Sequence, residues 1–432
     1  MTGLKSFVER QFKRFGINKK REITRLLFEI SKKEAIPYQK SCNNLPIDQN
    51  NYHLIKTQLL KRRFPRAFSQ NNRIKPYLPK LEIKSANRVK IKQAGFEFKP
   101  KNIYIEEEVY KCSMTDRFRR LFPESNFIRI KSIKTYIKEK GSPSISYYNN
   151  RCNNVFIVKE RFDFFKKCPC TKSAYFCGYH VFNLGFGCPY ECVYCYLQEY
   201  TNCPGIILPA NIERFFSQFS KYKKKGMRIG TGEFTDSLAL DNITQYSTAL
   251  TDFFSKNSEI IFEFKTKSSN ISNLLNSKHK GNIVISWSLN PPDIIEENEF
   301  YTAPLPERLS SAAACVKAGY KVGFHFDPMV YYRGWETDYE GLVNRLFDNI
   351  PARHIAWISI GSLRFNPHLK IIIENRFPEN RILDEELLLG FDNKLRYTDK
   401  IRFTMYKNML YWIKKRAKGV KVYLCMEKSG IK

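Results

Sequence analysis

The chain has 432 residues, of which 43% are hydrophobic and 15% aromatic, and it carries a net charge of +31. This composition is typical of a folded protein and argues against a disordered one. No apolar run approaches the roughly eighteen residues that a membrane helix needs, and the first residues are charged where a signal peptide is apolar. We therefore expect a soluble, cytoplasmic protein without a membrane partner.

Positive charge is concentrated at the N-terminus. Residues 1–100 hold 24 Lys and Arg against 7 Asp and Glu, a balance of +17. Lysine and arginine neutralise phosphates and release counterions, so this basic N-terminal extension predicts a nucleic-acid partner, with DNA favoured. The alternative is that the charge is solvated surface that reflects the composition of the chain as a whole.

Within the extension, the first forty residues predict one or two amphipathic helices. Residues 61–66 (KRRFPR) and 74–80 (IKPYLPK) are expected to be extended, because proline disfavours helix in the residue before it. From residue 101 the pattern becomes compact, with a short strand expected in 101–110 and a helix in 115–124.

Beyond residue 178, apolar segments rich in β-branched and aromatic residues alternate with helical ones. The expected strands lie in 179–186, 227–234, 259–267, 282–290, 321–332 and 355–363, and the expected helices include 241–256, 305–320 and 339–350. Apolar strands separated by helices indicate a parallel sheet with right-handed crossovers. Six such units predict an α/β fold, an incomplete (β/α)6 barrel of the TIM type.

Polar side chains gather where these strands end, which is where barrels place reactive groups. Each of them could equally be a turn or capping residue. The candidates are Glu233, Lys267, Ser288, Asn290, Asp327, Ser362 and Arg364.

Cys188, Cys192 and Cys195 form a C-x3-C-x2-C run directly after the first barrel strand. Thiolates are the ligands of iron-sulfur clusters, and a cubane has four irons, so three local cysteines leave one iron open. S-adenosylmethionine can bind that iron through its amino and carboxylate groups and be cleaved to a radical. Ferredoxin-type runs are spaced C-x2-C-x2-C, and structural zinc sites pair two cysteine knuckles. The run therefore predicts a 4Fe-4S cluster with S-adenosylmethionine.

Three more cysteines lie just upstream, at Cys168, Cys170 and Cys177. They could ligate a second metal or cluster, provide a redox-active thiol, or be buried apolar residues. The sequence leaves these alternatives open.

The cysteine run resembles the radical S-adenosylmethionine superfamily, and its flanks resemble the spore photoproduct lyase family of DNA photolesion repair enzymes. The similar segments are residues 168–200, 230–241 (GTGEFTDSLALD), 262–275 (FEFKTKSSNISNLL), 284–293 (VISWSLNPPD) and 318–339. The resemblance runs from about residue 101 to 430. It implies a lyase-like region that begins in residues 101–177 and continues as a radical S-adenosylmethionine barrel in 178–430.

The resemblance also implies roles for individual residues. Cys188, Cys192 and Cys195 would hold the cluster, and an external electron donor such as flavodoxin or ferredoxin would reduce it. The residues expected around S-adenosylmethionine are Tyr194, Glu233, Thr235, Lys267, Ser288 and Asp327.

One departure concerns the hydrogen donor. Spore photoproduct lyases carry a cysteine just after the second barrel strand that returns a hydrogen atom to the substrate radical, and here Glu233 stands about there. A carboxylate cannot donate a hydrogen atom. Another thiol such as Cys168, Cys170 or Cys177, a tyrosine such as Tyr196, or a different reaction would have to replace it. Glu233 would instead bind the amino group of S-adenosylmethionine.

Three hypotheses follow. The first is a radical enzyme that cleaves a thymine-derived lesion in DNA, with Tyr196 and Glu233 as its catalytic candidates. The second keeps the radical chemistry but acts on RNA, a protein or a small molecule. The third is a non-catalytic, metal-stabilised module that binds nucleic acid.

Overall fold

The computed structural model describes residues 2–42, 51–69, 74–91, 97–141, 144–160, 164–170, 177–200, 205–279 and 281–428. The chain divides into two compact units, and both are discontinuous in sequence. The larger unit comprises residues 90–362 and 404–432, and the smaller comprises 1–89 and 363–403. The boundaries expected near residues 100 and 177 stay predictions.

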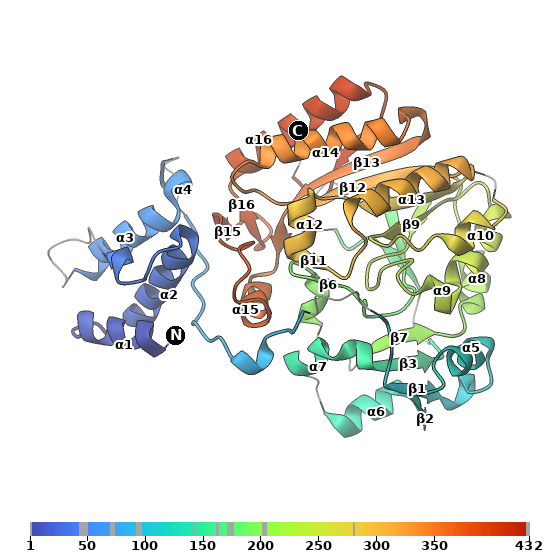
Figure 1. Ribbon diagram of the computed structural model, residues 1–432, viewed down its shortest axis with the longest axis horizontal. Coiled ribbons are helices and arrows are strands. Elements are labelled where there is room, and N and C mark those ends of the chain that lie inside the picture. Colours follow the sequence, from blue (N-terminus) through green and yellow to red (C-terminus); the bar gives the residue numbers. More distant parts are fainter. Residues whose placement is uncertain are drawn as a thin grey trace. The chain divides into compact units, whose positions relative to one another are not determined.

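The larger unit is built on an eight-stranded sheet with the order β17-β13-β12-β10-β9-β8-β5-β4 (Figure 1). All neighbouring strands are parallel except β4 and β5. Six of the strands are those expected from the sequence, so the incomplete barrel is confirmed. The bounds are β4 (Phe165–Lys167), β5 (Tyr179–Phe182), β8 (Arg228–Gly230), β9 (Ile261–Thr266), β10 (Ile283–Ser288), β12 (Lys321–Met329), β13 (Ile355–Ser362) and β17 (Val422–Leu424).

The strands are apolar because both faces of the sheet are covered. All six residues of β10 are buried, including Trp287, which is the pattern of a parallel strand with helices outside and side chains packed within. Helix α13 packs against β10 and β12, and Figure 1 shows α14 beside it. The C-terminal ends of the parallel strands therefore share one mouth.

Helices of the larger unit connect these strands. The helix expected over 241–256 is interrupted, because Gln245 adopts left-handed backbone (φ 55°) and divides it into α9 and α10. The bounds are α8 (Glu213–Phe219), α9 (Asp241–Thr244), α10 (Tyr246–Ser255), α11 (Ser272–Leu275), α12 (Pro292–Asn298), α13 (Leu305–Lys317), α14 (Trp335–Asn349) and α16 (Asp399–Arg416).

A second, four-stranded sheet has the order β2-β1-β3-β7, and all of its pairs are parallel. Its strands are β1 (Asn102–Glu106), β2 (Asn126–Ile130), β3 (Asn154–Val158) and β7 (Ile206–Pro209). Helices α5 (Ser113–Leu121), α6 (Ile133–Lys140) and α7 (Ile145–Asn149) belong to the same region. Strand β1 and helix α5 were expected from the sequence.

The smaller unit begins with four helices: α1 (Thr2–Gln11), α2 (Ile17–Glu34), α3 (Tyr52–Arg63) and α4 (Pro65–Ser69). They enclose a hydrophobic core that includes Val8, Leu26, Ile30 and Leu59. The expectation of extended chain at 61–66 is wrong: Arg63 ends α3, and Pro65 starts α4, where its missing N–H costs no helical hydrogen bond.

Residues 363–403 complete this unit. They form α15 (Pro367–Arg376) and a three-stranded sheet of order β14-β16-β15, with β14 (Arg364–Phe365), β15 (Leu387–Leu389) and β16 (Leu395–Tyr397). In the described part of the chain, every helix is too short or too polar to span a membrane.

Candidate functional site

The three-cysteine run follows β5 and so lies at the C-terminal end of a barrel strand. Cys192 belongs to the short strand β6 (Glu191–Cys192), and Cys195 immediately precedes a 3-10 turn at Tyr196–Glu199. The loop is entered through Gly187, whose φ of 91° is strained for any residue with a Cβ. The N–H of Gly187 donates to the carbonyl of Phe234 (2.8 Å), which joins the cysteine loop to the loop after β8.

Two buried side chains hold the backbone of the cysteine loop. Arg151 donates through Nε to the carbonyl of Cys188 (2.8 Å) and through its other nitrogens to the carbonyl of Tyr190 and the carboxylate of Glu191. Gln198 donates through Nε2 to the carbonyl of Cys195 (2.9 Å). Carbonyls fixed in this way keep the loop in one conformation.

Strand β6 pairs with β11 (Glu299–Phe300), so that Cys192 lies opposite Glu299. The Glu299 carboxylate accepts hydrogen bonds from Tyr194 Oη, Asn290 Nδ2 (2.9 Å) and Arg308 Nη2 (2.6 Å). Both members of the Arg308–Glu299 ion pair are fully buried. Desolvation alone would raise the pKa of Glu299, but Arg308 and Lys267 lower it, so this carboxylate is held ionised behind the loop.

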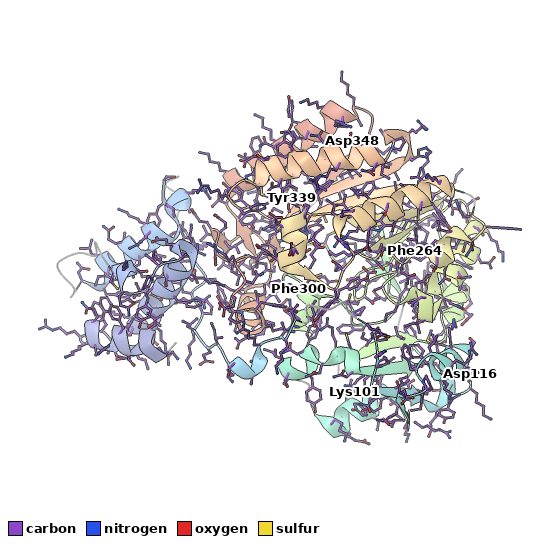
Figure 2. The ribbon with its side chains drawn as sticks, viewed as in Figure 1. Lys101, Asp116, Phe264, Phe300, Tyr339 and Asp348 are labelled. Carbon is purple, nitrogen blue, oxygen red and sulfur yellow. The ribbon has the colours of Figure 1, made fainter. Side chains whose placement is uncertain are left out.

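Further support comes from α14. Tyr339 donates to Asn290 Oδ1 (2.7 Å) and accepts from the Val330 N–H (2.8 Å). Figure 2 labels Tyr339 on α14 and Phe300 on β11. The loops after β10 and β12 are thereby linked to the network around Glu299.

Lys267 follows directly after β9. Its ammonium lies 5.6 Å from the ring centroid of Tyr194. Burial would lower the pKa of Lys267, but the neighbouring Cys192 and Glu299 raise it above its ordinary value. The chain thus places a cation beside two members of the cysteine loop.

Tyr196 and Glu233 are also brought together. The Tyr196 hydroxyl donates to the backbone carbonyl of Glu233, while the Glu233 carboxylate pairs with Lys166 Nζ at 2.9 Å. Burial is the largest influence on the Glu233 carboxyl and raises its pKa, against the opposing effect of Lys166. Tyr196 is 40% exposed, so its ring is open to a substrate.

Thr235 stands next to an aspartate that ties two strand ends together. The carboxylate of Asp236 accepts hydrogen bonds from Thr266 Oγ1 (2.6 Å) and from the N–H of Lys267 (2.8 Å). Asp236 also contributes, after burial, to the raised pKa of the Cys188 thiol. Asp236 therefore positions Lys267 from within the loop after β8.

Ser288 and Asp327 occupy the ends of their strands. Ser288 is the last residue of β10 and is buried, and its carbonyl accepts from Arg308 Nη1 (2.8 Å). Asp327 is half-buried near the end of β12. Ser288 therefore joins the Glu299 network through Arg308.

The upstream cysteines lie close to one another. Cys170 Sγ is 3.6 Å from Cys168 Sγ. The hydrogen bond with Cys170 and burial raise the pKa of the Cys168 thiol, and the nearby Cys425 and Cys177 raise it further. Within the described ranges, no three His, Cys, Asp or Glu side chains converge on a point as ligands of one metal ion do. A cubane takes each thiolate on a different iron, so its ligands stand farther apart than those of a single ion.

Sequence reasoning missed the side chains that support the site. Arg151, Gln198, Asp236, Glu299 and Arg308 bind loop carbonyls, strand ends or one another. Asp236 had a detectable signal, because it follows Thr235 in the strand-end motif. The others lie on segments without a motif of their own.

The sequence profile of the spore photoproduct lyase family matches residues 98–417. The chain belongs to the spore photoproduct lyase family. A spore photoproduct lyase of Bacillus subtilis (strain 168) is 27% identical over 301 residues, covering 67% of this chain and 86% of the relative. A spore photoproduct lyase of Geobacillus sp. (strain Y412MC61) is 27% identical over 305 residues, with the same two coverages.

Solved structures of the family share the fold. A spore photoproduct lyase mutant aligns with a TM-score of 0.66 at 24% identity, covering 76% of this chain and 99% of the other. Another mutant of that enzyme, with bound AdoMet and dinucleoside spore photoproduct, aligns with a TM-score of 0.65 at 23% identity over 77% of this chain and 99% of the other.

As a family member, the chain is a radical S-adenosylmethionine enzyme with a 4Fe-4S cluster. The residues present fit these cofactors. The loop between residues 183 and 200 offers three thiols and no fourth, which leaves one iron open for a chelating ligand.

Proposed function

We propose that this chain repairs a thymine-derived photolesion in DNA. The observation that carries the proposal is the three-thiol loop at the mouth of a parallel barrel in a chain of this family. When bound and reduced, the cluster supplies the electron that cleaves S-adenosylmethionine to a 5′-deoxyadenosyl radical. That radical would take a hydrogen atom from the lesion and so break its carbon-carbon bond.

The chain's own residues have the following proposed roles. Cys188, Cys192 and Cys195 hold three irons. The surroundings of S-adenosylmethionine are formed by Tyr194, Glu233, Thr235, Lys267, Ser288 and Asp327. Lys267 offsets negative charge at the cysteine loop, because it is a buried cation beside Cys192. Glu233 is oriented by its ion pair with Lys166.

The return of hydrogen to the product radical is proposed to fall to Tyr196 or to a nearby thiol. Tyr196 is exposed and bonded to the Glu233 backbone, and Cys168 is near enough to affect the pKa of Tyr196. Comparing Tyr196→Phe with Cys168→Ala separates the two. The donor is the residue whose loss abolishes recovered thymine while 5′-deoxyadenosine is still formed.

The proposed partners are DNA as substrate and an external one-electron donor such as flavodoxin or ferredoxin. A cytoplasmic location is proposed with them, since that compartment keeps thiols reduced. The cysteines in the described ranges are free thiols, which agrees with this location.

The test is an anaerobic incubation of the iron-reconstituted chain with S-adenosylmethionine, reductant and an oligonucleotide that contains spore photoproduct. Mass spectrometry is expected to detect both 5′-deoxyadenosine and restored thymine, and both should be lost in Cys188→Ala. The proposal would be refuted if the fully loaded chain formed neither 5′-deoxyadenosine nor restored thymine.

A different substrate, such as RNA, a protein or a small molecule, is the second candidate. The observation that favours it is Glu233, a carboxylate about where the family's hydrogen-donating cysteine is expected. Cofactor cleavage without recovered thymine would select it.

A further inference from the structure

The N-terminal part of the smaller unit has one apolar face. Leu4, Val8, Phe12 and Phe15 are buried, at the spacing that places them on one side of a helix and its following turn. The opposite side, from residue 3 to residue 21, faces solvent. This corner of α1 and α2 lies outside the residues matched by the family profile.

The charged side chains exposed on this corner are all cations except Glu9. Its six exposed cations are Lys5, Arg10, Lys13, Arg14, Lys19 and Arg21. In the described structure none of the six has a carboxylate within ion-pair distance. Glu9 is the single acid between residues 3 and 21, and it pairs with Lys20 at 2.6 Å.

The acids of the unit are engaged elsewhere. Glu29 is buried and pairs with Arg25 (2.6 Å), Arg63 (2.8 Å) and Lys370 (2.7 Å), while Arg25 Nη1 also bonds Glu374 (2.8 Å). The other acids that the structure describes in this unit bond cations or backbone N–H groups of the same unit: Glu22, Glu34, Glu82, Glu379, Asp384, Glu385, Glu386, Asp392 and Asp399. The positive field of the corner is therefore not cancelled by a nearby free acid.

We propose that this corner binds the phosphate backbone of duplex DNA without reading its sequence. Helix α1 has ten residues, which gives a length of about 15 Å, and successive phosphates of one strand advance by about 3.4 Å along the duplex axis. Several phosphates can thus face the corner together. Lysine and arginine side chains on a surface helix contribute contacts of this kind, which position a protein on DNA.

The corner offers little to a membrane. Among residues 3–21, Ile17 is the exposed large apolar side chain, at 63%. Amphipathic helices that bind membranes need an apolar face to bury among the lipids, and here that face is the core of the unit. The inference rests on the proposed function only in its choice of DNA, and binding of undamaged DNA can be measured without repair.

The experiment measures binding of the full chain to a short undamaged duplex by fluorescence anisotropy over a series of salt concentrations. The variant combines Arg10→Ala, Lys13→Ala and Arg14→Ala. Its control, Lys407→Ala with Lys415→Ala and Lys418→Ala, removes the same charge from exposed positions on and just after α16. Loss of three phosphate contacts makes the slope of log K against log salt less steep by about 2.7.

We expect the slope of log K against log salt to become less steep in the corner variant and to stay unchanged in the control. Equal changes in both variants would show a general effect of net charge and overturn the proposal. It would also be overturned if the corner variant lost binding to phosphatidylserine vesicles but not to DNA, or if the unmodified chain preferred single-stranded RNA. None of these outcomes depends on repair activity. Failure of the DNA-binding proposal can therefore be told apart from failure of the proposed repair function.

Discussion

Arg151 is a buried cation that holds the cysteine loop through three acceptors, on Cys188, Tyr190 and Glu191, and it also donates to the carbonyl of Tyr148 on α7 (3.1 Å). Its side chain is 2% exposed and that of its partner Glu191 is 7%. Desolvation of Arg151 would lower its pKa, but Glu191 raises it well above the ordinary value. The guanidinium therefore stays charged, and its fork of donors serves three backbone carbonyls and a carboxylate at once.

We predict that Arg151→Met reduces the iron and sulfide retained per chain after anaerobic reconstitution. Removing the cation breaks the buried ion pair with Glu191, which costs about 3–5 kcal/mol, and it frees the Cys188 carbonyl. Arg151→Lys keeps the charge but loses the fork, so its retention should be intermediate. Arg119→Ala, which breaks a more exposed ion pair with Asp116, is the control. If the Met variant retained as much iron as the unmodified chain, the cysteine loop would not need Arg151 to keep its conformation.

Residues of this site were predictable from the sequence when they belonged to a local motif. Cys188, Cys192 and Cys195 have a spacing specific to one chemistry, and Lys267 lies in a recognisable strand end. Arg151 could not be chosen, because it acts on a loop 37 residues away, and an isolated arginine is ordinarily a surface residue.

Among the elements, β9, β12 and β13 are joined by a polar network inside the barrel. His325 Nε2 lies 2.8 Å from Glu263 Oε1, and its Nδ1 contacts Ser359 Oγ. Burial and then Lys265 lower the pKa of His325, against Glu263 and Asp327, which raise it. Burial raises the pKa of Glu263, but His325 and Ser286 bring it down to about 2.

This network predicts that the barrel is less stable in acid. The pKa of His325 is lower in the folded chain than in the unfolded chain, so as the pH falls His325 is protonated first in the unfolded chain. The contribution of neutral His325 to the free energy of unfolding is therefore complete above about pH 6.5 and is lost progressively below it. The slope due to one histidine is at most about 1.4 kcal/mol per pH unit. Glu263 adds a second loss between about pH 4.5 and 2.

The measurement is the urea midpoint of unfolding at pH 7 and pH 5. His325→Gln should show a smaller difference between the two pH values than the unmodified chain. His53→Gln, at an exposed position on α3, should leave that difference unchanged. The same pH dependence in all three proteins would exclude His325 as its source.

The elements themselves were predictable where they were long and apolar. Strands β9, β10, β12 and β13 have six to nine residues each, whereas β4 and β17 have three. Three residues alone give too little periodicity to detect, and pairing with β5 or β13 is what makes β4 and β17 strands. Strand β8 also has three residues, but it was expected because it lies within the longer run 227–234. The break at Gln245 likewise has no glycine or proline to signal it.

In the whole molecule, the basic extension forms one unit with residues 363–403. Composition marked residues 1–100 as a basic segment, but it gave no reason to join residues 1–89 to residues 363–403. The contacts that do so are specific: Arg63 Nη2 donates to the carbonyl of Leu383 (3.0 Å), and Ala67 N–H donates to Glu386 (2.9 Å). Sequence patterns carry no information on such pairings.

We predict that Glu29→Gln in α2 loosens residues 363–403. Glu29 neutralises Arg25, Arg63 and Lys370, all buried, so its loss leaves close cations with too little compensating charge, at a cost of about 3–5 kcal/mol. Hydrogen exchange followed by mass spectrometry should show faster exchange in α15 than in the unmodified chain.

The matched control is Glu9→Gln, which removes the same charge from an exposed ion pair with Lys20 and should leave exchange in α15 unchanged. Faster exchange confined to α2 and α3 would mean that residues 363–403 keep their structure without this ion network. Faster exchange in α2, α3 and α15 together would mean that Glu29 stabilises both the N-terminal helices and residues 363–403, because its partner Lys370 lies on α15. The second result would show that the buried carboxylate of Glu29, which pairs with Arg25, Arg63 and Lys370, holds the helices of the extension and residues 363–403 in one folded unit.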